Sequence, residues 1–217
     1  MARPSPLREK RRVAEIFDRF ATATPEPRTE LTYRTSFELL VAVVLSAQAT
    51  DTSVNKATAR LFEIAPTPRA MLALGETDLI PLIASIGLFR TKARNVIALS
   101  RLLIERHGGD VPLERAALQS LPGVGRKTAS VVLNELGVEA AIAVDTHVFR
   151  VAHRLGLAVG KAPDQVEAEL MHIVPKKRLT RAHHWLILHG RYVCVARKPR
   201  CDACLVGDLC PSRDLFI

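Results

Sequence analysis

Four cysteines near the C-terminal end of the chain have the spacing of metal or cluster ligands. Cys194, Cys201, Cys204 and Cys210 are separated by six, two and five residues, and no cysteine precedes them. Thiolates converge on one point only when a cation holds them there, so we expect a metal or cluster rather than disulfides. Zinc and an iron–sulfur cluster both accept four thiolates, and the single C-x2-C pair flanked by longer spans favours the larger group.

The first cysteine span is strongly basic. It reads "VARKPR", and closing this loop around a metal should push Arg197, Lys198 and Arg200 outward together. Three cations on a stiff loop could hold a phosphate backbone.

A second chemical candidate is the segment "LPGVGRKTA" at residues 121–129, which reads as the turn between two helices. Pro122 ends the first helix, and Gly123 and Gly125 allow close approach of the backbone. The backbone N–H groups that start the second helix can then bind a phosphate.

Lys127 lies in the first turn of that second helix, where a positive side chain is unfavourable. Positive potential disfavours the ammonium form, and a neutral amine is a nucleophile. The alternative is that Lys127 contacts phosphate as a simple cation, and the spacing leaves both interpretations open.

Asp145 follows an apolar run and precedes an amphipathic segment, so it is placed to cap the N-terminus of a helix. A capping carboxylate stays ionised, which would also suit it to stabilise a developing sugar cation and to transfer protons.

The elements that carry these residues should be helical, because apolar residues recur at helical spacing and no segment alternates as a strand does. Thr35 with Glu38 forms a capping-box pattern, and Thr67 precedes a first-turn proline. We expect an all-α fold with a central helix that contains the apolar run from Leu39 to Leu45. Stop signals are predicted at these positions: Gly87, Gly108, Gly137, Gly156 and Pro175.

Composition narrows the class of protein. The chain has 217 residues, 48% of them hydrophobic, with 31 Lys and Arg against 22 Asp and Glu and a net charge of +9. This balance suits a polyanionic partner, although basic runs such as "RPSPLREKRR" from Arg3 are also common on solvated surfaces.

The longest apolar run is far shorter than a membrane span, and no apolar segment follows the basic N-terminus as in a secretory signal. We expect an intracellular, cytoplasmic protein, associated with the nucleoid if it is prokaryotic.

Five segments together resemble the endonuclease III family of bifunctional DNA glycosylases and AP lyases. They are "LPGVGRKTA", "AVDTHVFR", "LSAQATD" at 45–51, "HHWLILHGRY" at 183–192 and the cysteine tail, and the resemblance extends from about Thr35 to Cys210. One departure is Gln119, where many relatives have a glutamate, and it leaves substrate preference open.

The resemblance implies a helix-hairpin-helix DNA glycosylase fold with two helical lobes and a DNA-binding cleft between them. One would be a six-helix domain at 29–139 with the hairpin motif at about 113–136. The other would combine 1–28 with 140–217 and hold a [4Fe-4S] cluster on the four cysteines.

Roles for further residues also follow from the resemblance. Lys127 and Asp145 would be catalytic, and Ser46, Asp51 and His147 would line the active-site cleft. Gln48 would enter the gap left by a flipped base, and Leu88 would be a wedge against the opposite strand. On spacing alone, the alternatives are that Gln48 is an ordinary amide at a helix end and that Leu88 is an apolar contact that closes a helix at Gly87. The residues expected to contact DNA are Gln48, Leu88, Leu121, Gly123, Val124, Gly125, Arg197 and Lys198.

The implied activity is removal of oxidised pyrimidines from double-stranded DNA, with strand cleavage through a lysine Schiff base and β-elimination. Abasic sites would also be substrates, and we expect a monomer with no membrane partner. One alternative is a monofunctional adenine glycosylase of the same superfamily; the presence of Lys127 and the end of the chain at Ile217 argue against it. Another is a non-catalytic module for DNA binding or redox sensing.

Overall fold

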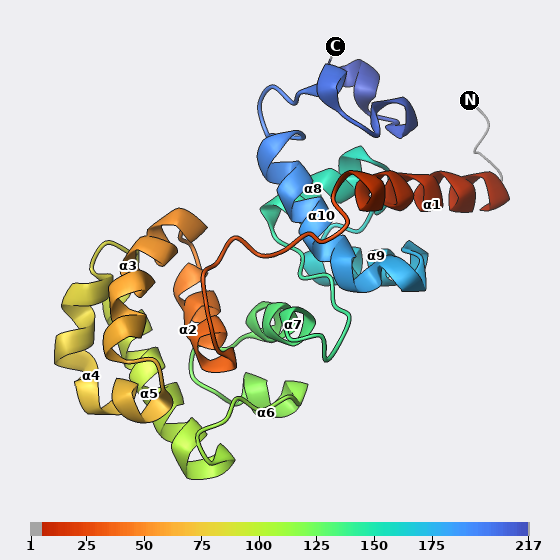
Figure 1. Ribbon diagram of the computed structural model, residues 1–217. Helices are drawn as coiled ribbons and strands as arrows, with labels where there is room; N and C mark the ends of the chain where they lie inside the picture. The colour runs from red at the N-terminus through yellow and green to blue at the C-terminus, as the bar shows by residue number, and fades with distance from the viewer. Residues whose placement is uncertain (1–5, 217) are drawn as a thin grey trace. The chain divides into compact units, whose positions relative to one another are not determined.

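The computed structural model describes residues 6–216, and in that range it contains helices and no strands (Figure 1). The predicted all-α class is therefore confirmed. The α-helices are α1 (Pro6–Ala23), α2 (Ser36–Ser46), α3 (Asp51–Ile64), α4 (Pro68–Ile83), α5 (Phe89–His107), α6 (Arg115–Gln119), α7 (Arg126–Glu135), α8 (Thr146–Arg154), α9 (Pro163–Ile173) and α10 (Leu179–Tyr192). Short 3-10 helices are η1 (Lys176–Arg178), η2 (Cys201–Ala203), η3 (Gly207–Leu209) and η4 (Arg213–Leu215).

The chain divides into two compact units. The central unit is Thr29–Glu139, and the terminal unit combines Met1–Arg28 with Ala140–Ile217. Each unit has its own cluster of buried apolar side chains. The two ends of the chain thus contribute to one core.

The central unit is built around α2, in which every residue from Phe37 to Leu45 is buried. A helix that is apolar on all faces is stable only when other helices surround it. Helices α3, α5 and α7 pack against α2 and cover it. The predicted central helix is therefore confirmed.

The helix starts agree with the sequence signals, with one change in detail. Thr35 accepts a hydrogen bond from the Glu38 amide at 3.2 Å, and Thr67 caps α4 just before its first-turn proline. The Glu38 carboxylate, however, accepts from the amide of Arg34 at 2.7 Å rather than from that of Thr35. The expected capping box is thus displaced by one residue on its carboxylate side.

Three of the predicted stop glycines have the left-handed conformation after a helix, namely Gly108, Gly137 and Gly156. The prediction for Gly87 is wrong, because Gly87 lacks a positive φ and lies beyond the end of α4 at Ile83. The left-handed residue of that turn is Leu88, with φ 59°, and its side chain is 61% exposed. The Leu88 side chain therefore does not make the apolar contact closing a helix at Gly87 that its spacing alone suggested.

The terminal unit is held together by the apolar face of α1. Val13, Ile16, Phe17 and Phe20 are buried there at helical spacing. The Phe17 ring packs against that of Trp185 in α10, whose Nε1 donates to the Thr24 carbonyl at 2.8 Å. The basic N-terminal stretch is helical from Pro6 onward, while its Arg3 to Ser5 portion lies outside the described residues.

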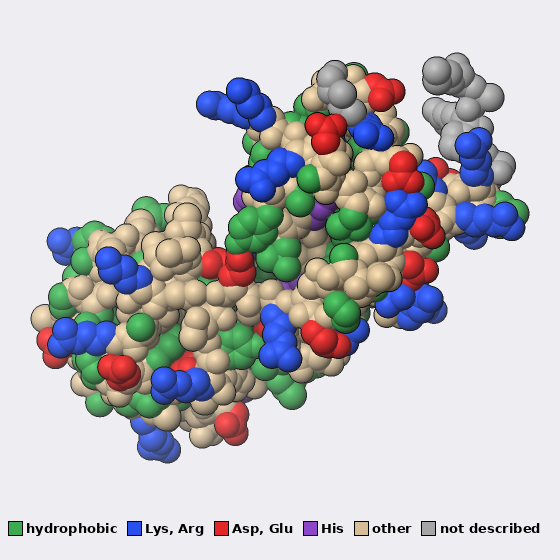
Figure 2. All heavy atoms as spheres, turned by 45° about the horizontal axis from the view of Figure 1, so that its top comes forward, with side chains coloured by type: hydrophobic (Ala, Val, Ile, Leu, Met, Phe, Trp, Pro, Cys, Tyr) green, Lys and Arg blue, Asp and Glu red, His purple; other side chains and the backbone are tan. Residues whose placement is uncertain are grey.

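Charged side chains of both signs share one face of the molecule. On the face drawn in Figure 2, Lys and Arg side chains project into solvent with Asp and Glu side chains interspersed among them. Among the described residues, no helix combines the length and the apolar character needed to cross a bilayer.

Helix α5 contains a buried lysine. Lys92 is 4% exposed, and its Nζ has no hydrogen-bond partner within residues 6–216. Burial lowers the pKa of Lys92 below its ordinary value of 10.5, because the charged form is poorly solvated there. An unpaired buried amine is expected to reduce stability.

Lys92→Met should raise the free energy of unfolding by about 1–2 kcal/mol, because it removes the unpaired amine and keeps the length of the side chain. Between the folded pKa of Lys92 and 10.5 the unfolded chain holds a proton that the folded chain lacks, so wild-type stability should rise with pH in that window. The variant should lose this slope. Urea denaturation at a series of alkaline pH values measures both effects.

The matched control is Lys56→Met, which changes an exposed lysine on α3 and should keep the slope. A Lys92→Met protein less stable than the wild type would show instead that the buried amine makes a favourable interaction.

Candidate functional site

The turn between α6 and α7 requires a glycine at position 123. Gly123 has φ 80°, and a Cβ there would lie 3.1 Å from the Asn95 side chain and 3.2 Å from Val44. These neighbours come from α5 and α2, so the turn is seated directly on the core of the central unit. The sequence interpretation of Gly123 as a residue of close approach is confirmed.

Gly125, by contrast, is not required by its protein neighbours. It caps α7 with an ordinary φ of −85°, and a Cβ at this position would have no atom within 4 Å. The first backbone hydrogen bond of α7 runs from the Ala129 amide to the Gly125 carbonyl, at 3.0 Å. The space over the start of α7 is therefore open to a ligand that approaches the backbone.

Lys127 is the second residue of α7, and its side chain is exposed. Leu121 and Val124, in contrast, are buried, at 3% and 5% exposure, and the Val124 amide donates to the Leu121 carbonyl at 3.1 Å. These two side chains anchor the turn rather than face a ligand. Lys127, like the adjacent Arg126, can reach outward from the hairpin.

Asp145 caps α8, as its position in the sequence predicted. Its Oδ1 accepts from the amides of His147 and Val148, each at 2.8 Å. No hydrogen bond within the described chain involves Oδ2. The carboxylate is thus fixed by one oxygen, while the half-buried side chain keeps the other available.

His147 is held from the other side by Arg150, whose Nη2 lies 3.2 Å from the imidazole Nδ1. The same Nη2 donates to the Gly190 carbonyl of α10 at 2.8 Å. A Cβ on Gly190 would lie 2.9 Å from the His147 Cβ, so α8 and α10 pack closely at this point. The capped end of α8 is therefore rigidly supported within the terminal unit.

Gln48 and Leu88 are brought together in the central unit, although 40 residues separate them. They are the two non-glycine residues of the described chain with positive φ, at 54° and 59°. A Cβ on Gly87 would lie 3.8 Å from the Gln48 carbonyl, so the two turns are adjacent. Both side chains are exposed, and strained backbone of this kind often marks a functional contact.

Ser46 and Asp51 flank the Gln48 turn. Ser46 ends α2, with its hydroxyl donating to the Val43 carbonyl at 2.8 Å, and Asp51 begins α3. Lys127 shares the central unit with these residues, whereas Asp145 and His147 belong to the terminal unit.

All four cysteines line one pocket of the terminal unit, together with Arg154, His189 and Pro199. No three His, Cys, Asp or Glu side chains in the described part of the chain are arranged to hold a single metal ion. Four thiols that line one pocket fit a shared metal or cluster.

The environment of the thiols fits a cluster as well. Burial raises the pKa of the Cys204 and Cys210 thiols, and the neighbouring cysteines raise them further. Thiolates at these positions therefore need a bound cation to stabilise them. His189, whose pKa burial lowers to about 4, places its Nε2 3.6 Å from the Cys204 Sγ and can donate to that sulfur.

Arginines that the sequence did not single out hold the backbone of the cysteine segment. Arg150 donates to the Cys194 carbonyl at 3.0 Å, and Arg154 donates to the carbonyls of Val195 and Ala196, each at 2.8 Å. Arg154 Nη1 also lies 3.5 Å from the Cys194 Sγ. The sequence contained one signal for this role, the pair of arginines four residues apart in "FRVAHR". This spacing places both side chains on one face of α8 but does not show that they bind the cysteine segment.

The basic residues of the first cysteine span point to solvent. Arg197, Lys198 and Arg200 are all exposed, as predicted from closing the loop around a metal. Their backbone is fixed at its end by the Arg200 amide, which donates to the Val193 carbonyl at 2.9 Å.

Comparison with known proteins agrees with this geometry. A sequence model of HhH-GPD superfamily base excision DNA repair proteins matches residues 41–176. A model of the iron-sulfur binding domain of endonuclease III matches residues 194–210. Endonuclease III of Escherichia coli strain K12 is 54% identical over 200 residues, which cover 92% of this chain and 95% of the relative.

The chain belongs to the endonuclease III family. Endonuclease III of Rickettsia conorii is 57% identical over 198 residues, covering 91% of this chain and 94% of the relative. A solved structure of a trapped endonuclease III–DNA covalent intermediate superposes with a TM-score of 0.88 at 45% identity, covering 95% of this chain and 97% of that one. The helix-hairpin-helix glycosylase fold is therefore confirmed.

Membership of the endonuclease III family establishes the general activity. The protein is a base excision repair enzyme that acts on DNA as a glycosylase and AP lyase, and it binds a [4Fe-4S] cluster. The non-catalytic alternative is thereby excluded. When bound, the cluster ties the cysteine segment together and supplies the counter-charge for its thiolates.

The two glycines of the hairpin should differ in their effect on stability. Gly123→Ala should lower the free energy of unfolding by about 1–3 kcal/mol, because alanine is strained at positive φ and would crowd Asn95. Gly125→Ala should change it by only about 0.5 kcal/mol, because its Cβ enters open space. Urea denaturation of both variants measures the contrast, and equal losses would contradict the distinction.

Proposed function

We propose that the protein removes oxidised pyrimidines from double-stranded DNA and cleaves the resulting abasic strand, with Lys127 as the nucleophile. The observation that carries this proposal is the position of Lys127, exposed in the first turn of α7 directly after the hairpin. The similar solved structure is, by its own description, a trapped covalent intermediate with DNA, which supports a covalent mechanism here.

In the proposed reaction the Lys127 amine attacks C1′ of the damaged nucleotide, and the bond from C1′ to the base breaks. The base leaves with the bonding electron pair and takes up a proton. The sugar ring then opens to a Schiff base on Lys127. Loss of a C2′ proton and of the 3′ phosphate by β-elimination cuts the strand 3′ to the lesion, and water releases the lysine.

Asp145 is the proposed partner in this chemistry. Its carboxylate would stabilise positive charge on the sugar and carry protons between steps. The hydrogen bonds at Oδ1 hold it in place, and Oδ2 is the oxygen that can face the substrate.

Phosphate binding is assigned to the start of α7 and to the basic span of the cysteine segment. The open space at Gly125 lets a phosphate approach the first-turn amides, where the helix dipole favours an anion. The exposed Arg197 and Lys198 would add sequence-independent contacts. We further propose that the enzyme is a monomer. Because its relatives are bacterial, we propose that it works in the cytoplasm on nucleoid DNA.

Gln48 and Leu88 are the proposed residues for opening the duplex. Their adjacent, exposed turns would place the amide in the gap left by the flipped base and the leucine against the opposite strand. The left-handed backbone at both positions is a cost of about 1–3 kcal/mol each that a purely structural turn would not need.

Borohydride reduction of an enzyme mixture with thymine-glycol duplex should give a covalent protein–DNA adduct, because it converts the Schiff base to a stable amine. Lys127→Gln should abolish the adduct. Arg126→Gln, which removes the adjacent exposed cation, should retain it. Denaturing gel electrophoresis gives the yield, and an undiminished adduct in Lys127→Gln would refute the assignment.

Leu88→Gly should raise stability by about 1 kcal/mol, because glycine is unstrained at φ 59°. The same change should lower kcat/KM on a duplex lesion by about tenfold and affect a single-stranded lesion much less, because unpairing is then not required. Ile64→Ala is the control for loss of an exposed apolar side chain. Equal losses on both substrates would contradict a wedge role for Leu88.

A further inference from the structure

Helix α1 reaches the last cysteine span through two arginines on one face. Arg12 and Arg19 are separated by seven residues, or about two helical turns, so their side chains project in the same direction. Both donate to the segment 205–209, which lies between Cys204 and Cys210. The first helix of the chain is thus attached to its last cysteines.

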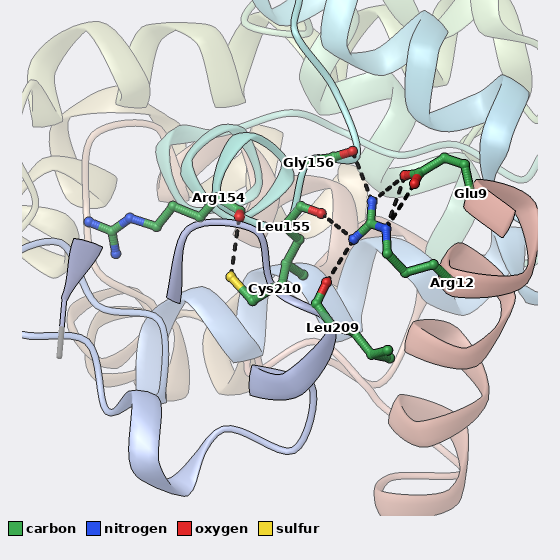
Figure 3. Close-up of polar contacts among 7 residues, drawn as sticks. All are labelled: Glu9, Arg12, Arg154, Leu155, Gly156, Leu209 and Cys210. Atoms are coloured by element: carbon green, nitrogen blue, oxygen red, sulfur yellow. Dashed lines mark hydrogen bonds and ion pairs between the residues drawn. The ribbon is translucent and has the colours of Figure 1, made fainter. Parts of the chain in front are cut away.

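The Arg12 guanidinium joins two separate segments of backbone, as Figure 3 shows. Its Nη1 donates to the Leu155 carbonyl at 2.7 Å and to the Leu209 carbonyl at 2.9 Å, and its Nη2 donates to the Gly156 carbonyl at 3.2 Å. Leu155 and Gly156 follow the end of α8, where carbonyls lack helical partners. One side chain therefore ties the end of α8 to the residue before Cys210.

Glu9 fixes the orientation of this guanidinium. Its carboxylate accepts from Arg12 on the same helix, and that hydrogen bond holds the pKa of Glu9 below its ordinary value. A planar fork with a fixed orientation directs its donors toward separate carbonyls, whereas a lysine has its three donors on a single nitrogen at the end of a flexible stem.

Arg19 makes the second attachment. Its Nη1 donates to the Leu205 carbonyl at 3.0 Å, and its two terminal nitrogens bind Asp208 at 2.6 and 2.9 Å. The Arg12 side chain is 19% exposed and that of Arg19 is 34% exposed, so water screens Arg12 less. Arg12 should contribute more to the attachment.

The attached segment has little other means of holding its shape. Between Cys204 and Cys210 it forms only the single 3-10 turn η3, and Val206 is its fully buried apolar side chain. The Cys210 Sγ lies 3.2 Å from the Arg154 carbonyl oxygen, which places this cysteine next to the end of α8 (Figure 3). Without the arginines, local opening would expose Cys204 and Cys210 while the helices stay folded.

We propose that Arg12 and Arg19 are positioning residues that keep Cys204 and Cys210 in place and so control how long the protein retains its cluster. Helix α1 is then part of the cluster housing, and the housing is complete only when the two ends of the chain meet. This inference rests on the assignment of the four cysteines as cluster ligands.

The test is the rate at which the full-length holoprotein loses iron to an excess of a ferrous chelator, followed by the visible absorption of the cluster. Arg12→Gln should accelerate iron loss by about tenfold and Arg19→Gln by less, because hydrogen bonds from a charged group are lost in each. Asp208→Asn should have a smaller effect than Arg19→Gln, since the bond to the Leu205 carbonyl remains.

The matched control is Arg11→Gln, which removes an exposed arginine next to Arg12 and should lose iron at the wild-type rate. Circular dichroism at the same temperature should show unchanged helix content in all variants, which separates segment opening from global unfolding. Should Arg12→Gln fail to fold, Arg12→Lys and Arg19→Gln carry the test.

Equal rates of iron loss in Arg11→Gln, Arg12→Gln and Arg19→Gln would overturn the proposal. Accelerated loss that occurs only together with loss of helix content would also overturn it. A wild-type protein that contains no iron would instead overturn the assignment of the cysteines, so the two failures are distinguishable.

Discussion

The structure of the terminal unit depends on keeping four thiols around one pocket within a segment that has almost no regular secondary structure. Burial disfavours their thiolates, and the short 3-10 turns η2 and η3 leave many backbone carbonyls without helical partners. Arginines from two helices bind carbonyls along the cysteine segment: Arg12 and Arg19 from α1, and Arg150 and Arg154 from α8. The cluster and the arginine donors thus stabilise one arrangement together.

The two proposed catalytic residues use the starts of two helices in opposite ways. Asp145 satisfies the amides at the start of α8 and adds a negative charge where the helix dipole favours one. Lys127 neither caps the amides at the start of α7 nor adds a negative charge there. The turn before it packs on Val44 and Asn95 through Gly123, a position where any other residue would be strained. A rigid turn that presents an unfavourably placed lysine to solvent is consistent with chemistry rather than with helix stability.

Three further residues have a conformation or an environment that is expected to lower the free energy of unfolding. Gln48 and Leu88 adopt left-handed backbone that their side chains disfavour, and the structure places their turns side by side. Lys92, on α5, is buried with no hydrogen-bond partner among the described residues, and it lies one helical turn before Asn95 and therefore on the face that approaches Gly123. These residues are all in the central unit, near the hairpin or near the proposed wedge.

The sequence by itself determined what is local. Helical periodicity gave the all-α fold, Thr35, Thr67 and Asp145 marked helix starts, and the cysteine spacing indicated a shared metal site, because each of these signals depends on residues a few positions apart. Tertiary structure decided that Leu88 rather than Gly87 is left-handed, that Gly123 but not Gly125 is required by packing, and that Gln48 lies beside the Leu88 turn. It also decided that Arg12 and Arg19 reach the last cysteines. Contacts between segments so far apart in the chain depend on how the helices pack, and a pattern read along one segment contains no information about its partner.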